Sequence, residues 1–188
     1  MNRDIKLSDL VKDKNVLLVG NSSSLLKKDN SNLIDSFEFV IRFNLSITHI
    51  SAYSIGTKCD AWVFAMCRDE VIRKTYNGSK IKPKVCVRYG STFDIGEVNI
   101  NLDVNKDDIR KELNIEEEAH PSTGVVITWY ILNKAKTKSV SLIGFDSFKN
   151  HNFYTKHNKA HLCHNPDAEK NYLSGLAKNK KITLFDIL

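Results

Sequence analysis

Short runs of apolar residues recur along the chain, separated by polar or charged segments. The runs are rich in Val, Ile and Leu, which is typical of strands that are covered on both faces of a sheet. We predict strands at residues 15–20, 37–43, 60–65, 84–88, 138–143 and 181–185. No internal repeat, low-complexity tract or proline-rich linker divides the sequence. We therefore expect residues 1–188 to form one domain.

Three segments between these runs have helical patterns, namely residues 107–119, 123–135 and 166–177. The second is apolar at almost every position after Gly124, which indicates a helix buried against a sheet. The third opens with acidic residues, as the start of a helix favours. Strands that alternate with helices predict an α/β fold, with a mostly parallel sheet and helices on both faces.

The composition is that of a globular protein, with 41% hydrophobic and 27% charged residues. The formal net charge of +6 suits an anionic ligand, a nucleic acid or an anionic membrane surface, and does not choose among them. The basic residues are not interleaved with aromatic ones, as they are on platforms that bind single-stranded nucleic acid. We therefore expect no nucleic-acid partner.

The N-terminal residues 1–14 are charged and lack the apolar core of a signal peptide. No apolar run approaches the roughly 20 residues that span a bilayer. We expect a cytoplasmic protein, and peripheral contact with the inner face of the membrane stays open. The cysteines form no CxxC pair, so we expect reduced thiols at Cys59, Cys67, Cys86 and Cys163.

Ligands of parallel α/β sheets bind beyond the carboxyl ends of the strands. Asn21 and Ser22 follow the first predicted strand, where backbone amides and hydroxyls can bind a phosphate. The segment is neither a dinucleotide-binding loop nor a Walker loop. Asn44 follows the second strand, and its amide can donate to a phosphate or a sugar hydroxyl. An ordinary capped turn remains the alternative for each.

The start of the apolar helix is a further candidate for anion binding. Ser122 and Thr123 supply hydroxyls next to the first amides of the helix, and Gly124 would let a ligand approach the backbone closely. An ordinary helix cap is again the alternative.

Histidines gather after the fifth predicted strand, in a polar stretch with the composition of a loop that covers a ligand. An imidazole there can act as a general base toward a hydroxyl. His157, His161 and His164 also have the spacing of one helix face, beside Cys163, so a zinc site is an alternative, as are solvated histidines. The sequence has no Asp-x-Asp pair for a divalent metal on a nucleotide diphosphate.

Several of these segments together resemble the motifs of one enzyme family. The stretches VLLVGNSSSL, IDSFEFVIRFN and IGTKCD, at residues 16–25, 34–44 and 55–60, resemble the large sialylmotif of the animal-type sialyltransferases. HPSTGVVITWYIL at 120–132, running on to VSLIGFD at 140–146, is similar to their small sialylmotif. His164 and Glu169, with four residues between them, resemble the very small motif. Residues 66–118 match no motif of the family.

The resemblance implies a Rossmann-like single domain, a variant of the GT-A type. It implies an inverting glycosyltransferase that needs no metal or other cofactor and moves sialic acid from a CMP-sialic acid donor to a hydroxyl of a glycan or lipopolysaccharide-type acceptor. The family's N-terminal anchor and its disulfide have no counterpart here, which points to a compact microbial or viral form. A CMP-Kdo-dependent transferase of the same fold, and a non-catalytic nucleotide- or zinc-binding module, remain alternatives.

The resemblance also implies roles for particular residues. His164 matches the catalytic base, and Glu169 matches its partner glutamate. His151 and His157 are both candidates for the histidine that steadies the departing phosphate. The residues that match the donor-binding positions are Asn21, Ser22, Asn44, Ser122, Thr123 and Gly124.

Overall fold

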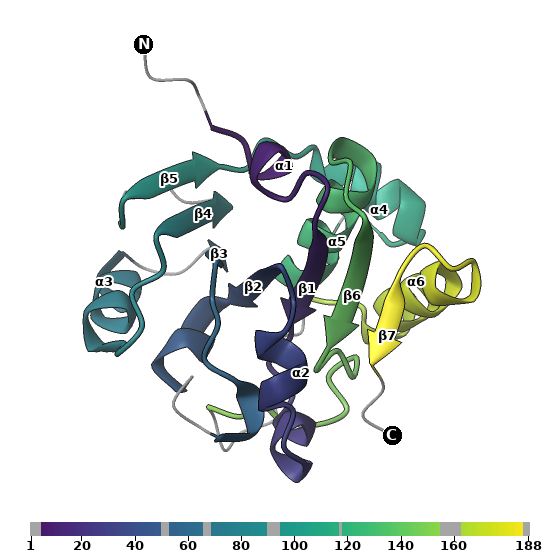
Figure 1. The fold of residues 1–188 in the computed structure, drawn as a ribbon. Coiled ribbons are helices and arrows are strands. Elements are labelled where there is room, and N and C mark those ends of the chain that lie inside the picture. Colours follow the sequence, from purple (N-terminus) through teal and green to yellow (C-terminus); the bar gives the residue numbers. More distant parts are fainter. Residues whose placement is uncertain are drawn as a thin grey trace.

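The computed structural model describes residues 5–49, 53–65, 69–89, 95–116, 118–154 and 163–185. Its core is a seven-stranded sheet with the order β5-β4-β3-β2-β1-β6-β7, in which every neighbouring pair is parallel (Figure 1). From β1, successive strands β2 to β5 are added on one side of the sheet, and β6 and β7 are added on the other side. The strand order therefore reverses between β1 and β6. The strands are β1 (Asn15–Val19), β2 (Phe39–Phe43), β3 (Ala61–Ala65), β4 (Val85–Tyr89), β5 (Val98–Asn101), β6 (Ser139–Ile143) and β7 (Thr183–Phe185).

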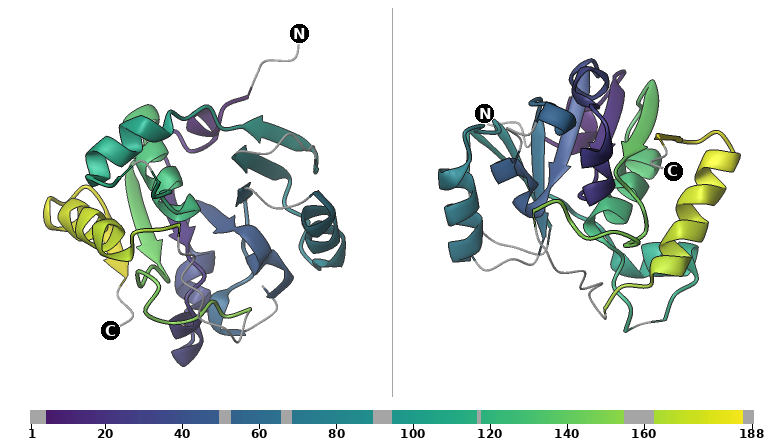
Figure 2. Two further views of the ribbon diagram at one scale, coloured as in Figure 1. Left: turned by 180° about the vertical axis from the view of Figure 1, so that it is seen from behind. Right: turned by 90° about the horizontal axis from the view of Figure 1, so that it is seen from below.

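Helices cover both faces of this sheet, which confirms the predicted fold class (Figure 2). One face packs against α1 (Leu7–Leu10), α4 (Lys106–Leu113), α5 (Thr123–Lys134) and α6 (Pro166–Lys178). The other face packs against three 3-10 helices and two α-helices: η1 (Ser23–Lys27), α2 (Ser31–Asp35), η2 (Asn44–His49), η3 (Tyr53–Ile55) and α3 (Asp69–Gly78).

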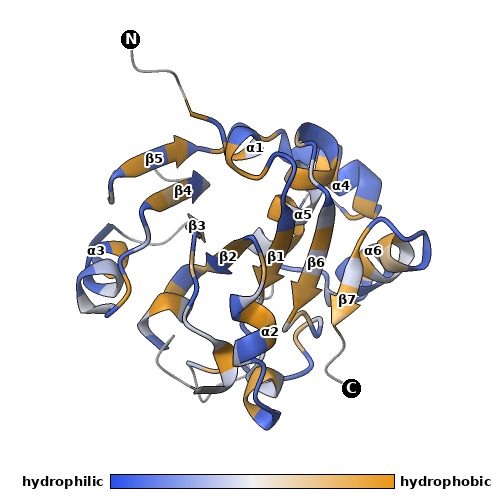
Figure 3. Ribbon diagram, in the orientation of Figure 1, coloured by the Kyte–Doolittle hydropathy of each residue, from blue (hydrophilic) through white to orange (hydrophobic). Residues whose placement is uncertain are grey.

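The buried helix α5 forms the centre of the larger core. Every side chain from Val125 to Ile131 is buried, as its nearly unbroken apolar sequence predicts. Figure 3 shows hydrophobic residues along this helix and along the neighbouring strands β1 and β6. Because α5 packs on this central part of the sheet, its N-terminus is held in a fixed position.

The structure contains helices that the sequence did not predict, namely α1, α2, α3 and the three 3-10 helices, and it differs from the predicted elements in two further places. Helix α4 ends at Leu113, earlier than predicted, because Asn114 adopts a left-handed conformation with φ of 53°. The edge strand β5 was not predicted, since its sequence VNIN is short and half polar. The other predicted strands are present, within two residues of their expected ends.

Two glycines let the segments after β1 and β6 approach each other closely. The Gly20 amide donates to the Ile143 carbonyl at 2.7 Å. A Cβ atom at Gly20 would collide with the backbone carbonyl of Gly144, and Gly144 itself has a φ of 77°. Only glycine tolerates such a close backbone contact or such a φ without strain. These two residues therefore bring together the two loops at which the strand order reverses.

No helix within the described ranges is long and apolar enough to cross a membrane. The cysteines that the structure describes are free thiols, and burial raises the pKa of Cys59 and of Cys86 to about 12. Cys67 lies outside the described residues.

Candidate functional site

A cavity of about 190 Å³ lies beyond the carboxyl ends of β1, β2 and β6. It sits where the strand order reverses, which is where open α/β sheets bind their ligands. His164 and Glu169 line it, together with every residue that the motifs assign to the donor: Asn21, Ser22, Asn44, Ser122, Thr123 and Gly124. The fold thus brings four separate segments of the chain to one place.

In the first loop, Asn21 and Ser22 differ in how they use their side chains. The Ser22 hydroxyl accepts from the Ser24 amide at 3.1 Å and donates to Asp146 Oδ2 at 2.7 Å, so it holds protein segments together. Asn21 Nδ2 donates to the Tyr154 hydroxyl at 3.1 Å. Asn21 Oδ1 is buried and has no hydrogen-bond partner among the described residues. A buried acceptor without a partner is costly, and a ligand donor in the cavity would satisfy it.

The segment after β6 folds back over this loop. Ser22 and Asn152 form an isolated antiparallel bridge, and the Phe153 amide donates to the Asn21 carbonyl at 2.9 Å. The Ser23 amide donates to the His151 carbonyl at 2.8 Å. The His151 side chain is exposed and is not among the residues that line the cavity. His157, the other candidate for the phosphate, lies outside the described residues.

Asn44 occupies the turn at the end of β2 with a left-handed φ of 50°, a conformation that asparagine adopts more readily than most residues. Its Oδ1 accepts from the Ala65 amide at 3.3 Å. With the oxygen used in this way, the Nδ2 group is the part of the side chain that can donate to a ligand in the cavity.

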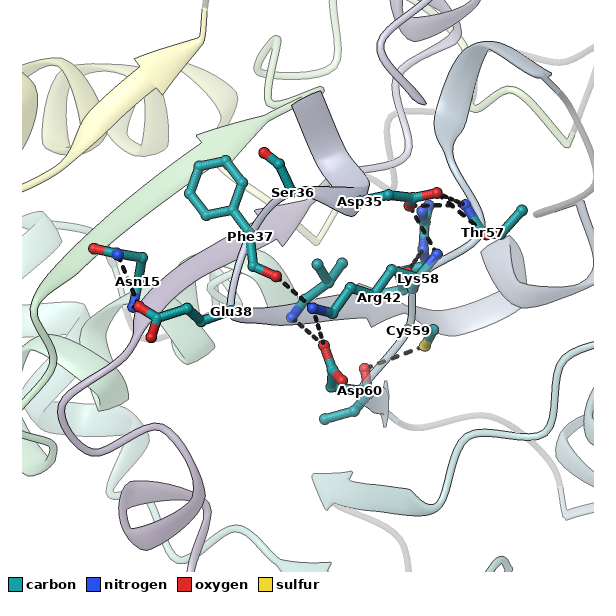
Figure 4. Close-up of polar contacts among 12 residues, drawn as sticks. Asn15, Asp35, Ser36, Phe37, Glu38, Arg42, Thr57, Lys58, Cys59 and Asp60 are labelled. Atoms are coloured by element: carbon teal, nitrogen blue, oxygen red, sulfur yellow. Dashed lines mark hydrogen bonds and ion pairs between the residues drawn. The ribbon is translucent and has the colours of Figure 1, made fainter. Parts of the chain in front are cut away.

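Several other residues of the large-motif stretch do not line the cavity. They support β2 through the polar contacts drawn in Figure 4. The buried Arg42 donates to the Ile55 carbonyl at 2.6 Å and to the Lys58 carbonyl at 2.9 Å. Asp35 accepts from the backbone amides of Thr57 and Lys58, each at 2.9 Å from Oδ1. These contacts hold the turn after η3 against β2. They therefore fix the position of the end of β2 and of Asn44, which follows it.

Glu169 joins α6 to the start of α5. Its carboxylate is only 4% exposed, and it accepts from both the amide and the hydroxyl of Ser122 at 2.7 Å each. Ser122 is the N-cap residue of α5, yet its side chain makes no capping hydrogen bond because it is bound to Glu169. The first amides of a helix carry partial positive charge. The first residues of α5 line the cavity, so this charge lies beside it.

Gly124 lines the cavity, and its lack of a side chain also makes room for a neighbouring ring. A Cβ atom there would collide with the ring of Phe145. The glycine therefore makes room for Phe145, which itself lines the cavity. Close approach of a ligand to Gly124 stays a prediction.

His164 lies immediately before α6, and its ring is held on two sides. Its Nδ1 lies 2.6 Å from the His120 carbonyl oxygen. A carbonyl only accepts, so Nδ1 carries the proton, and in the neutral ring Nε2 has the lone pair. The ring also stacks on Phe148, with centroids 5.4 Å apart and planes 18° apart. An imidazole held in this way, at the edge of a polar cavity, has the geometry of a general base.

The backbone of the chain is similar to those of sialyltransferases of known structure. A mammalian sialyltransferase in complex with Gal-beta-1-3GalNAc-ortho-nitrophenol matches with a TM-score of 0.61 and 20% sequence identity, over 95% of this chain and 71% of that chain. CstII from Campylobacter jejuni in complex with cytidine-5'-monophosphate matches with a TM-score of 0.57 and 19% identity, over 93% and 79%. The chain has the sialyltransferase fold. No protein-family model and no curated protein matches the sequence.

The aromatic residues of the loop after β6 were not identified from the sequence as part of the site in this sialyltransferase fold. Phe148 stacks on His164, and Tyr154 is bonded to Asn21. Both Phe148 and the preceding Ser147 have left-handed backbones, with φ of 62° and 54°. A single aromatic residue in a polar loop gives no periodic signal, so these positions could not be found from the pattern alone.

The structure describes no group of three His, Cys, Asp or Glu side chains that could hold a metal ion. Two residues of the zinc alternative, His157 and His161, lie outside the part of the chain to which this applies.

Substituting Glu169→Gln should change how the stability of this sialyltransferase fold depends on pH. Burial raises the pKa of the Glu169 carboxyl above its ordinary value of 4.5, against the hydrogen bonds from Ser122 and a smaller electrostatic contribution from His164 that lower it. An acid with a raised pKa binds its proton more tightly in the folded state. Its ionisation therefore lowers stability as the pH rises from 4.5 through the folded pKa.

Glutamine does not ionise. The difference in free energy of unfolding, wild type minus variant, should accordingly fall as the pH rises through this window. Urea denaturation of both proteins at a series of pH values measures it. A difference that rises with pH would show that the hydrogen bonds from Ser122 outweigh burial.

Proposed function

We propose that the protein is a glycosyltransferase that moves sialic acid from CMP-sialic acid to a hydroxyl of a glycan or lipopolysaccharide-type acceptor, with inversion and without a metal. One observation carries this proposal. A histidine with the geometry of a general base shares a cavity with the start of α5 and with Asn21 and Asn44. This cavity occupies the ligand-binding edge of a fold in which CstII was solved with the substrate analogue CMP-3FNeuAc.

The start of α5 suits the anionic groups of such a donor. A CMP-sugar of this kind carries a phosphate and a carboxylate, and helix N-termini bind both. Thr123 and Gly124, the first residues of α5, line the cavity. Because Ser122 is bound to Glu169, its hydroxyl does not compete with the ligand for these amides.

The two asparagines fit the nucleoside side of the donor. The buried Oδ1 of Asn21 needs a hydrogen-bond donor, which a ribose hydroxyl supplies and an ionised phosphate does not. The Nδ2 group of Asn44 can donate either to a phosphate oxygen or to a ribose hydroxyl.

The acidic residues in the described lining support catalysis without a metal. They are Asp146 and Glu169. Asp146 accepts from Ser22 and Asn150, and Glu169 accepts from Ser122. Both carboxylates thus already bind protein donors. A monophosphate leaving group also carries less charge than a diphosphate, so helix amides and amide side chains suffice to stabilise it.

The reaction assigns one proton transfer to His164. The oxygen of the acceptor hydroxyl forms a bond to the anomeric carbon as the bond from that carbon to the phosphate oxygen breaks, and CMP leaves. Attack from the face opposite the phosphate inverts the configuration. His164 Nε2 takes the hydroxyl proton, and the His120 carbonyl stabilises the resulting imidazolium through Nδ1.

CMP should raise the melting temperature of the protein, and UDP should not. Binding to the folded state adds RT ln(1 + [L]/Kd) to the free energy of unfolding, which is about 2.7 kcal/mol at a hundredfold excess over Kd. Differential scanning fluorimetry with CMP, UDP or Zn²⁺ measures the effect. The two nucleotides are each measured with and without EDTA. A shift with zinc alone would contradict the proposal and favour a metal-binding module.

Transfer itself is tested by a screen of CMP-sugars, including CMP-sialic acid and CMP-Kdo, with release of CMP as the readout. Preference for CMP-sialic acid in a metal-free buffer is the expected result. Release of CMP from CMP-Kdo alone would reassign the donor and keep the reaction.

A further inference from the structure

A second hollow lies at the amino ends of the strands, at the opposite end of the sheet from the cavity described above. It has a volume of about 510 Å³. Its walls come from the end of α5, the connection from α5 to β6, and α6, which meet at this end of the sheet in Figure 1. Buried apolar side chains of these elements line it, together with three exposed lysines: Lys136, Lys138 and Lys181.

Further lysines surround this hollow. The Asp13 amide donates to the Lys136 carbonyl at 2.7 Å, and the Lys138 amide donates to the Lys14 carbonyl at 3.0 Å, so residues 12–14 lie beside residues 136–138. We call the segments 12–14, 134–138 and 178–181 the basic end. They hold eight lysines and one acidic residue. The whole chain has a net charge of +6, so its other residues together are close to neutral.

Within the described residues, little of this charge is paired with an acidic side chain. Of the eight lysines, Lys138 alone forms an ion pair within the described residues, at 3.4 Å from Glu38. Glu112 also lines the hollow, but its carboxylate accepts from Trp129 Nε1 at 2.5 Å and from the Tyr172 hydroxyl at 3.3 Å. The positive charge of the basic end is therefore available to a partner.

We propose that the basic end docks on an anionic lipid bilayer, with a phospholipid headgroup in the hollow. All the basic residues of these segments are lysines. Compact ammonium groups on flexible stems suit a diffuse layer of lipid phosphates, whereas arginine is favoured where a planar anion is bound with fixed geometry. Ile5, which is 45% exposed, precedes α1 at this same end and can enter the boundary between headgroups and acyl chains.

The position of the surface agrees with this use. The basic end and the cavity lie at opposite ends of parallel strands, so a docked molecule keeps its cavity open to soluble donor and to acceptor. The inference does not depend on the proposed function, because it uses none of the residues that line the cavity.

Co-sedimentation with lipid vesicles tests the proposal. The full-length protein should bind vesicles of phosphatidylcholine with phosphatidylserine, and should not bind phosphatidylcholine alone. Binding should weaken at about 1 M salt, where the screening length falls to about 3 Å. The triple variant Lys136→Gln, Lys138→Gln, Lys181→Gln should bind about 100-fold more weakly, since each lysine near such a surface contributes about fivefold.

A matched control is the triple variant Lys27→Gln, Lys28→Gln, Lys74→Gln, which removes the same charge from exposed positions on η1, its C-cap and α3. It should bind anionic vesicles nearly as well as the wild type. Melting curves with CMP show that both variants are folded and that the cavity is intact, separately from docking. Equal losses in the two variants, or equal binding to neutral vesicles, would overturn the proposal. A third result would also overturn it: the triple variant at the basic end loses binding to an acidic polysaccharide and still binds anionic vesicles. The basic end would then be a glycan-binding surface.

Discussion

Replacing His164 with alanine is expected to lower the turnover of sugar transfer by about 10²–10⁴-fold while CMP continues to bind. The Nδ1 contact with the His120 carbonyl assigns the lone pair to Nε2, and the ring lines the cavity with Asn21 and Ser122. Without the imidazole, the acceptor hydroxyl must lose its proton unaided. Initial rates at saturating donor and acceptor measure the loss, and a CMP melting shift measures binding.

The variant His164→Asn is the matched control. Its amide nitrogen can still donate to the His120 carbonyl, but it cannot accept the hydroxyl proton, so we expect it to be as slow as the alanine variant. His151→Ala and His157→Ala separate the two candidates for the phosphate. We expect the smaller loss at His151, because its side chain is exposed and is not among the lining residues. Wild-type turnover in His164→Ala would refute the proposed mechanism.

Gly20→Ala should destabilise the fold by about 1–3 kcal/mol or more. The added methyl group would collide with the Gly144 carbonyl, and backbone directly after a central strand cannot move aside as a flexible side chain can. The collision separates β1 from β6 at the point where the cavity forms. Urea denaturation gives the change in free energy of unfolding, and weaker CMP binding should accompany it.

Gly175→Ala makes the same chemical change with the opposite expected sign. Gly175 lies inside α6, and a Cβ atom there has nothing within 4 Å. Alanine is favoured over glycine in a helix interior by about 0.5–1 kcal/mol, so this variant should be more stable than the wild type. If Gly20→Ala unfolds at the same urea concentration as the wild type, the two loops do not approach as closely as described.

Much of the sheet could be predicted from the sequence because its strands are covered on both faces and therefore appear as continuous apolar runs. The exception is β5, at the edge of the sheet, where only Ile100 is fully buried and polar residues alternate with apolar ones. The end of α4 was also missed, because one left-handed residue, Asn114, stops a helix whose charged pattern continues beyond it.

Many of the residues that line the cavity could be named from the sequence, but their contacts could not be predicted. Resemblance to sialylmotifs selected residues that the fold brings to one cavity. The hydrogen bonds that organise them join residues far apart in the chain, such as Ser122 with Glu169 and Ser22 with Asp146. No local pattern contains such pairs. For the same reason, the contact between Gly124 and Phe145 could not be predicted from the sequence.

The lining of the cavity runs from Gly20 to Leu173, which is nearly the whole length of the chain. No fragment that ends before α6 contains it. A ribosome must therefore release almost the entire polypeptide before this cavity can form, and contacts between such distant residues form slowly. Affinity for CMP would thus report on completed folding, which makes the ligand a probe for chains that have reached the native state.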